Sequence, residues 1–341
     1  MQLEARIATV QMAETFVISR GASDEAEVVY VEIRHDGVSG FGEAAPIERY
    51  DESAESAQAF ALEASELLGD DPFALEEIEA RLRGRPGEHA AKAAIDAALH
   101  DLCGKLVGLP AWRLLGLRRE GPPTSWTIWL GDPDEMARRT ERVDGRFRRL
   151  KLKLGARDGR DVERVRAVRE VSDVPLQVDV NEAWSLDEAL EALPQLAELA
   201  VQYCEQPLPA GDPDGPELKR RSPLPIYVDE DCHTLDDVAA CAERAHGLTV
   251  KLAKSGGIRE AIRMAHAGRA LGLGLMLGCM NESGLAVAAG AACASLFDHV
   301  DLDGNLLLVE DPWPGVELVD GVQLPSNDPG LGVREAVPDP R

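Results

Sequence analysis

From Ser125 to Asp303 the sequence alternates between short apolar segments and longer segments with helical periodicity. Strands buried on both faces of a parallel sheet have this apolar character, and each connection is long enough for a helix. Eight strands separated by helices indicate a closed barrel, because an open parallel sheet of that width would be unusual. The expected strands are 125–130, 149–154, 176–180, 201–205, 226–229, 248–252, 275–279 and 299–303.

Amphipathic helices are expected between these strands, most clearly at 161–171, 186–199, 235–245 and 259–271. No eighth helix is expected after Asp303, where turn residues and short β patches follow. No dinucleotide fingerprint follows the first strand, which argues against a Rossmann fold. The fold class is therefore α/β, with a (β/α)7β modified TIM barrel.

The first 120 residues have a different pattern. A strand at 28–33 turns at His35, Asp36 and Gly37 into a second strand at 38–43, and helical periods follow at 57–68 and 88–106. We expect an α+β capping domain at 1–120, the barrel at 121–308 and a tail at 309–341 that returns to the capping domain.

The formal net charge of -25 argues against nucleic acid or an anionic membrane as a partner, because both would repel the chain. The six cysteines show no Cys-x-x-Cys spacing and are typical of small buried residues in a reducing compartment. The longest apolar run, 271–280, is too short to span a bilayer, and the N-terminus has no basic leader. We expect a cytoplasmic protein.

The segment 149–155 alternates polar and apolar residues, so Lys151 and Lys153 leave one side of a strand. On a core-facing wall each would desolvate the other and both pKa values should fall, as a lysine base near neutral pH requires. An exposed edge strand with solvated lysines is the alternative.

Ionisable residues recur at the ends of five successive expected strands, 22 to 26 residues apart: Lys153, Asp179, Glu205, Asp229 and Lys251. Active sites of parallel barrels lie at this carboxyl end. Three converging carboxylates repel one another unless a cation lies among them, and oxygen ligands favour Mg²⁺. A single such carboxylate would more simply be a solvated strand end or a helix cap.

The second and sixth strands lie on opposite walls of an eight-stranded ring. A substrate between Lys153 and Lys251 could lose an α-proton on one face and regain it on the other, with the metal stabilising an enediolate. A Schiff-base aldolase would also use a barrel lysine but does not need three carboxylates.

Asp301 and Asp303 share a face of the last strand, across the ring from the carboxylates. They would suit a cationic group of the substrate, such as an α-ammonium. An isolated Asp-x-Asp is usually a turn, and its position in the ring favours the functional interpretation here.

Together these residues resemble the enolase superfamily, in its muconate lactonizing enzyme branch, and within it the dipeptide epimerases of the L-Ala-D/L-Glu epimerase kind. The resemblance extends over nearly the whole chain, through the segments 40–44, 94–98, 151–153, 179–181, 205–207, 229–230, 251–257, 278–280 and 330–333.

The resemblance implies a role for each of several residues. The metal ligands would be Asp179, Glu205 and Asp229, for one Mg²⁺ in the active site, with Lys153 and Lys251 as the two bases and Lys151 assisting at the substrate carboxylate. Asp301 and Asp303 would bind the ammonium group of a dipeptide. Thr127, Cys279, Met280 and, in the first capping loop, Arg20 would contact the substrate.

The expected activity is epimerisation of the C-terminal residue of an L-Ala-L-Xaa type dipeptide by two-base 1,1-proton transfer. Muconate cycloisomerases, o-succinylbenzoate synthases and N-acylamino acid racemases share the scaffold, but their substrates carry no such ammonium group. A catalytically inactive binding protein is a further alternative, disfavoured by the intact residues at all five strand ends. A homo-oligomer is left open, as are the identity of the dipeptide and its pathway.

Overall fold

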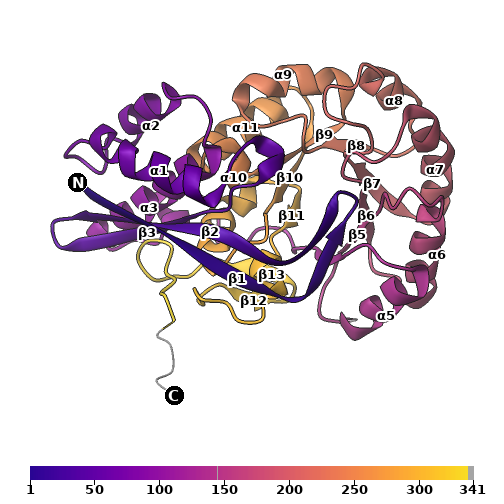
Figure 1. Cartoon of the computed structure of the whole chain (residues 1–341), viewed down its shortest axis with the longest axis horizontal. Helices are drawn as coiled ribbons and strands as arrows, with labels where there is room; N and C mark the ends of the chain where they lie inside the picture. Colours follow the sequence, from indigo (N-terminus) through magenta and orange to yellow (C-terminus); the bar gives the residue numbers. More distant parts are fainter. Residues whose placement is uncertain (144, 337–341) are drawn as a thin grey trace.

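Eight parallel strands form the central sheet of the computed structural model, which describes residues 1–143 and 145–336 (Figure 1). Each strand pairs with its neighbour in the sequence, and a bridge between Thr124 and Val300 joins the first strand to the last. The strands are β4 (Trp126–Ile128), β5 (Leu150–Lys153), β6 (Leu176–Asp179), β7 (Val201–Glu205), β8 (Ile226–Val228), β9 (Gly247–Lys251), β10 (Gly274–Gly278) and β11 (His299–Asp301). The predicted barrel and all eight of its strands are confirmed.

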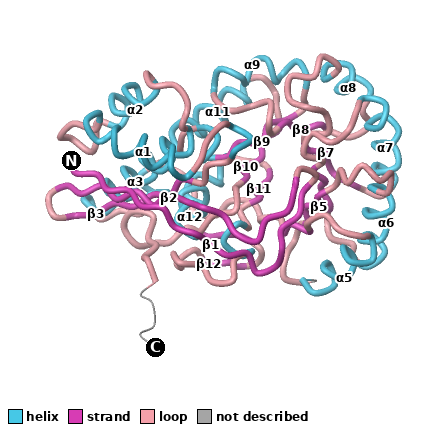
Figure 2. The backbone as a smooth tube through the Cα atoms, in the orientation of Figure 1, coloured by secondary structure: helices cyan, strands magenta, loops and turns pink. Residues whose placement is uncertain are grey.

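Every connection between these strands contains a helix, and the helices cover the outside of the barrel (Figure 2). They are α5 (Pro133–Val143), α6 (Asp161–Val171), α7 (Leu186–Glu198), α8 (Gly215–Arg221), α9 (Leu235–Arg244), α10 (Leu252–Ser255), α11 (Ile258–Ala270) and α12 (Gly284–Cys293). In the described chain after β11, only a 3-10 turn, η4 (Gly304–Leu307), follows before the tail. The (β/α)7β topology is therefore confirmed.

Two of these helices show how the local sequence determines the elements. In α7, Ser185 caps the N-terminus in a reciprocal pair with Glu188, and Ala189, Leu193 and Leu196 are buried against the barrel. Helix α12 is apolar on all sides and almost wholly buried, so it lacks the amphipathic period by which the other helices are recognised.

The capping unit is a three-stranded antiparallel sheet covered by helices. Its elements are β1 (Gln2–Ile18), β2 (Gly21–His35), β3 (Val38–Ala44), η1 (Glu48–Tyr50), α1 (Ala54–Ala64), η2 (Ser65–Leu67), α2 (Leu75–Arg83), α3 (His89–Val107) and α4 (Ala111–Leu114). Gly42 allows β3 to approach α3, because a Cβ there would lie 2.0 Å from the Ala94 carbonyl oxygen. The meander followed by helices that the sequence predicted is present.

The chain after η4 includes a short hairpin of β12 (Glu317–Val319) and β13 (Val322–Leu324). Further along, Leu331 donates its backbone N–H to Asp101 of α3 at 2.7 Å, and Gly330 bridges to Pro110. This part of the tail thus lies against the capping unit, whereas the hairpin contacts the barrel, where Thr124 donates its backbone N–H to the Gly321 carbonyl at 2.8 Å. The predicted tail also includes residues 337–341, which lie outside the described residues, and the domain limits stay a prediction.

The β1–β2 hairpin, for which no strand limits were predicted before residue 28, extends from the capping sheet across the barrel (Figure 1). Near its tip, Leu130 donates to the Val17 carbonyl at 2.9 Å, and the Ser19 hydroxyl donates to the Asn181 carbonyl at 2.9 Å. The hairpin therefore contacts barrel loops at the carboxyl ends of the strands. No helix among the described residues has the length and apolar character needed to cross a membrane.

Candidate active site

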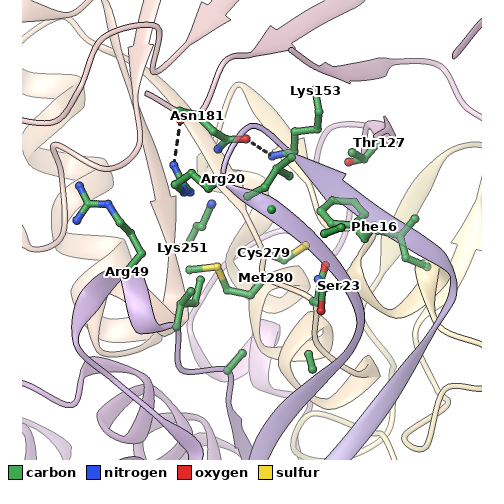
Figure 3. A pocket seen from close by; sticks show the side chains of 18 of the residues that line it. Phe16, Arg20, Ser23, Arg49, Thr127, Lys153, Asn181, Lys251, Cys279 and Met280 are labelled. Carbon is green, nitrogen blue, oxygen red and sulfur yellow. Dashed lines mark hydrogen bonds between the residues drawn. The ribbon is translucent and has the colours of Figure 1, made fainter. Parts of the chain in front are cut away.

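A cavity of about 690 Å³ lies between the capping unit and the carboxyl ends of the barrel strands (Figure 3). Both units contribute to its walls, with Phe16 from β1 and Ile47 before η1 on the capping side. Of the residues predicted from the sequence, the lining includes Arg20, Thr127, Lys151, Lys153, Lys251, Cys279, Met280, Asp301 and Asp303. The structure therefore brings these predicted residues to one site.

The strand register explains this convergence. Lys153 pairs with Asp179 and Asp179 with Glu205, so the ionisable residues of β5, β6 and β7 lie at one level of the barrel. Across the ring, Lys251 of β9 is in register with Gly278 of β10. A Cβ at position 278 would lie 3.1 Å from the Lys251 Cε, so glycine leaves room for the lysine side chain.

Both lysines expected to act as bases pair with a buried carboxylate. The Lys153 ammonium donates to Asp179 Oδ2 at 2.6 Å, and the Lys251 ammonium donates to Asp229 Oδ2 at 2.7 Å. β5 and β9 lie four positions apart in the sheet order, so the two lysines approach the cavity from opposite walls.

The Lys151 ammonium group lies among three carboxylates. Its Nζ is 2.7 Å from Glu205 Oε2, 2.8 Å from Asp301 Oδ2 and 3.2 Å from Asp179 Oδ2. The side chain is almost wholly buried. A buried ammonium with three carboxylate neighbours is held in its charged form.

The expectation of a lowered pKa is wrong for Lys151, and the pKa of Lys251 is likewise raised. Burial lowers both, but the neighbouring carboxylates outweigh it: Asp301, Glu205 and Asp179 raise the pKa of Lys151 well above its usual value, and Asp229 raises that of Lys251. Mutual desolvation of Lys151 and Lys153 predicted the fall, but the carboxylates of adjacent strands attract the ammonium groups, and this attraction dominates in a buried site.

The three expected metal ligands are fully buried at the ends of β6 and β7 and just after β8. They do not form a ready cluster: among residues 1–143 and 145–336, no three histidine, cysteine, aspartate or glutamate side chains are arranged to hold a metal ion. The reason is that lysine ammonium groups lie among these carboxylates. Besides burial, Asp179 and Asp229 still both raise the pKa of Glu205, so the three carboxylates lie near one another, and their role as metal ligands stays a prediction.

Glu205 nevertheless has the properties of a cation ligand. Neither of its buried oxygens accepts a hydrogen bond from a described residue, although the Lys151 ammonium is close. Burial, and next the Asp179 carboxylate, raise the pKa of Glu205 to about 7. Buried carboxylate oxygens without donors are costly, and a hard divalent cation would compensate them, so the donor set fits such an ion.

Lys254 is a residue whose place in the site the sequence did not reveal. Its ammonium donates to Asp229 Oδ1 at 2.6 Å, to the Asp229 carbonyl at 2.5 Å and to the Thr249 carbonyl at 2.9 Å. It follows Lys251 by three residues in the short helix α10, and that spacing was the available signal. Lys254 does not line the cavity, so Asp229 is held by one lysine from the cavity, Lys251, and by a second one outside it, Lys254.

Asp301 and Asp303, at the end of β11, form an acidic part of the cavity wall across the ring from β7. Asp303 Oδ2 accepts the backbone N–H of Thr127 at 2.7 Å, while Asp301 Oδ1 is buried without a hydrogen-bond partner among the described residues. Burial and the Asp301 carboxylate raise the pKa of Asp303 to about 7. This pair can accept hydrogen bonds from a cationic substrate group.

Arg20 reaches the site but already has partners. Its Nη1 donates to the Asn181 carbonyl at 3.1 Å, to Glu182 Oε2 at 3.1 Å and to Glu230 Oε1 at 2.8 Å. Arg49, from η1, binds Glu182 through its Nε at 2.9 Å and its Nη2 at 2.8 Å. Neither Arg49 nor Glu182 was predicted, because the short 3-10 helix η1 and the turn after β6 have no periodic pattern.

A (β/α)7β barrel closed by an α+β cap, with acidic and lysine residues at its strand ends, is the architecture of a barrel enzyme whose active site lies at the carboxyl ends of the strands. Two family models match the chain: the mandelate racemase / muconate lactonizing enzyme N-terminal domain over residues 2–116 and the enolase C-terminal domain-like family over residues 135–336. The chain belongs to this mandelate racemase / muconate lactonizing enzyme family of the enolase superfamily.

Three relatives illustrate the similarity. The L-Ala-D/L-Glu epimerase of Bacteroides thetaiotaomicron is 38% identical over 328 residues, which is 95% of this chain and 85% of that protein. The hydrophobic dipeptide epimerase of Flavobacteria bacterium strain MS024-2A is 37% identical, over 95% of each chain. The crystal structure of the dipeptide epimerase of Enterococcus faecalis V583, complexed with Mg and L-Leu-L-Tyr, matches with a TM-score of 0.92 and 29% identity, over 97% of this chain and 98% of that chain.

Proposed function

We propose that this chain is a Mg²⁺-dependent dipeptide epimerase that inverts the α-carbon of the C-terminal residue of a dipeptide by two-base 1,1-proton transfer. The observation that carries the proposal is the placement of Lys153 and Lys251 on opposite walls of one cavity. The names of the relatives support the same reaction class and its metal requirement.

Each lysine has one role in a given direction of the reaction. The neutral amine of one lysine takes the α-proton from its face of the substrate, and the ammonium group of the other returns a proton to the opposite face. The partners Asp179 and Asp229 orient the two Nζ atoms through their short hydrogen bonds. Because lysine has three exchangeable protons, solvent deuterium enters the substrate whenever either lysine returns a proton.

Asp179, Glu205 and Asp229 would hold the Mg²⁺ ion. Bound there, a divalent cation supplies electrostatic stabilisation for the negative charge that develops as the α-proton leaves. Lys151, which is buried and held protonated, adds a second positive charge close to the same carboxylates. We assign it to the substrate carboxylate.

Asp301 and Asp303 would bind the N-terminal ammonium group of the dipeptide, and Thr127 positions Asp303 through its backbone N–H. This assignment favours dipeptides over the substrates of N-acylamino acid racemases, muconate cycloisomerases and o-succinylbenzoate synthases, because those substrates lack the ammonium group. The cap closes the cavity over the second side chain with Phe16, Ile47 and other lining residues.

We expect an uncharged second side chain. Arg20 and Arg49, the arginines that line the cavity, are each within 3 Å of a glutamate oxygen, and the three lining lysines also have carboxylate partners. Glu27 and Glu48 add negative charge to the same lining. A dipeptide ending in Glu would therefore meet no uncommitted cation among the described lining residues.

Mass spectrometry of L-Ala-L-Xaa dipeptide pools incubated with the protein and Mg²⁺ in D₂O tests the function. We expect deuterium at one α-carbon of particular dipeptides, loss of exchange with EDTA, and recovery when Mg²⁺ is returned. Folded, Mg²⁺-loaded protein that exchanges no dipeptide would contradict the proposal. N-acylamino acids and the cycloisomerase and o-succinylbenzoate synthase substrates should then be tested.

All six cysteines are free, and five are buried. This supports a reducing compartment, and we propose the cytoplasm as the place of the reaction. Assembly into a homo-oligomer stays a prediction, to be measured by light scattering.

A further inference from the structure

We infer that Glu182 is a positioning residue that joins the capping unit to Lys153, so that closure of the cap sets the geometry of one of the two bases. The juxtaposition behind this inference is a continuous chain of contacts from Arg49 and Arg20 through Glu182 and Asn181 to the Lys153 ammonium. The inference rests on the proposed two-base function of the site.

Glu182 binds Arg20 and Arg49, the two arginines of the cap that line the cavity. Its Oε1 accepts from Arg49 Nη2 at 2.8 Å and from the backbone N–H of Ala210 at 2.9 Å. Its Oε2 accepts from Arg49 Nε at 2.9 Å and from Arg20 Nη1 at 3.1 Å. Because the planar guanidinium of Arg49 binds both oxygens, it fixes the orientation of the carboxylate as well as its charge.

Asn181 carries the contact onward to the base. Its carbonyl accepts from the Ser19 hydroxyl at 2.9 Å and from Arg20 Nη1 at 3.1 Å, both on the capping hairpin. Its side-chain Oδ1 accepts from the Lys153 ammonium at 3.3 Å (Figure 3). The same residue therefore contacts the cap with its backbone and the base with its side chain.

The backbone of this loop depends on such outside contacts. Asn181 and Glu182 have φ values of 46° and 69°, in the left-handed region that residues with a Cβ disfavour. The backbone N–H of Glu182 donates to the Gln206 carbonyl at 2.8 Å, which holds the loop on the barrel side. Two successive residues in this conformation persist only where neighbouring groups hold them, so loss of the cap contacts would move Asn181.

No hydrogen bond or ion pair among the described residues joins the second base to Glu182 or Arg49, although Arg20 also binds Glu230, the residue after Asp229, at 2.8 Å. Lys251 binds Asp229, which Lys254 holds from the barrel side. A disturbance of Glu182 should therefore affect proton transfer at Lys153 more than at Lys251. A residue that merely stabilises the fold would affect both faces of the substrate alike.

The test compares Glu182→Gln with wild type in D₂O, using both epimers of the best dipeptide substrate with Mg²⁺ and following deuterium at the α-carbon before inversion. Lys153→Ala identifies which epimer loses exchange when this base is absent. For that epimer we expect Glu182→Gln to lower the initial exchange rate by about 10-fold to 100-fold, in kcat more than in KM. The exchange rate of the other epimer should fall by less than about threefold.

Glu14→Gln is the matched control. Glu14 also lies on the capping hairpin and pairs with a barrel arginine, Arg142, at 2.9 Å. This pair is not part of the chain of contacts that leads to Lys153. Glu14→Gln should leave both exchange rates unchanged. Arg49→Gln removes the Arg49–Glu182 ion pair by changing the arginine, and it should lower the exchange rate of the same epimer as Glu182→Gln does. This second variant keeps the inference testable if Glu182→Gln folds poorly.

Equal losses for both epimers, or no loss in either Glu182→Gln or Arg49→Gln, would overturn the inference. If wild type exchanges neither epimer of any dipeptide, the proposed function itself fails, and that outcome is distinct because it does not involve the variants.

Discussion

The Glu43 carboxyl is buried where the capping unit meets the barrel, and its replacement by glutamine should stabilise the protein at alkaline pH. Glu43 lies on β3 and is 3% exposed. It accepts hydrogen bonds from the Ser283 hydroxyl and from the Ser283 backbone N–H, the latter at 2.9 Å. Ser283 follows the segment with Cys279 and Met280, so this contact supports one wall of the active-site cavity.

The size of the effect follows from the pKa of Glu43. Burial raises it from 4.5 to about 7, against the lowering effect of the Ser283 hydrogen bonds. A carboxyl whose pKa is higher in the folded than in the unfolded protein favours folding below the unfolded value, and this contribution is lost as pH rises through the folded value. Between pH 4.5 and pH 8 the loss amounts to about 3 kcal/mol, and Glu43→Gln, which cannot ionise, avoids it.

Equilibrium urea unfolding at pH 5 and pH 8.5, followed by circular dichroism, measures this effect. The free energy of unfolding of Glu43→Gln minus that of wild type should be about 2.5 kcal/mol larger at pH 8.5 than at pH 5, with similar m values. Glu243→Gln, on the exposed face of α9, is the control and should show no such pH dependence. The same pH dependence in wild type and Glu43→Gln would refute the reasoning.

Four further outcomes test the site itself. Lys153→Ala and Lys251→Ala should each abolish epimerisation and retain α-deuterium exchange of opposite epimers; full epimerisation by either variant in a coupled polarimetric assay would exclude the two-base mechanism. Mg²⁺ at 100 times its Kd should stabilise wild type by about 2.7 kcal/mol in calorimetry, with EDTA reversing the effect, whereas Glu205→Gln should show little stabilisation. Asp301→Asn and Asp303→Asn should raise KM for dipeptides by about 10-fold or more in steady-state assays, and an unchanged KM would contradict ammonium binding there. Finally, kcat/KM should be higher for L-Ala-L-Leu than for L-Ala-L-Glu, and the reverse order would contradict the assignment of both cavity arginines to glutamate partners.

Much of the fold could be predicted because its signals are local. Buried parallel strands show apolar runs, and amphipathic helices repeat every three to four residues, so each element can be recognised within its own segment. Helix α12 lacked this signal because it is buried on every side. The predicted hairpin is that of β2 and β3, whereas the limits of β1 and of the hairpin that it forms with β2 were not predicted, since the outer half of that hairpin is exposed and shows no core-facing alternation.

The recurrence of ionisable residues at strand ends also predicted which side chains share the site. Lys153, Asp179 and Glu205 lie in register because successive parallel strands of a barrel end at the same rim. The pKa values could not be obtained in this way. They depend on which carboxylate oxygen each ammonium group approaches. For Lys251, the attraction of the nearby Asp229 carboxylate raises the pKa by more than desolvation lowers it.

The sequence by itself determined the barrel, its cap and the set of charged residues at the rim, because these follow from periodicity and from the regular spacing of strand and helix. Only the tertiary structure decided how those charges pair and how the cap engages the barrel. Arg20 meets Glu230 across 210 positions of the chain, and Arg49 meets Glu182 across 133. Contacts of this kind join residues that are far apart in the sequence. Electrostatic interactions weaken with distance and with exposure to water, so the partner of each charged side chain is determined by proximity and burial in three dimensions and not by a local sequence pattern.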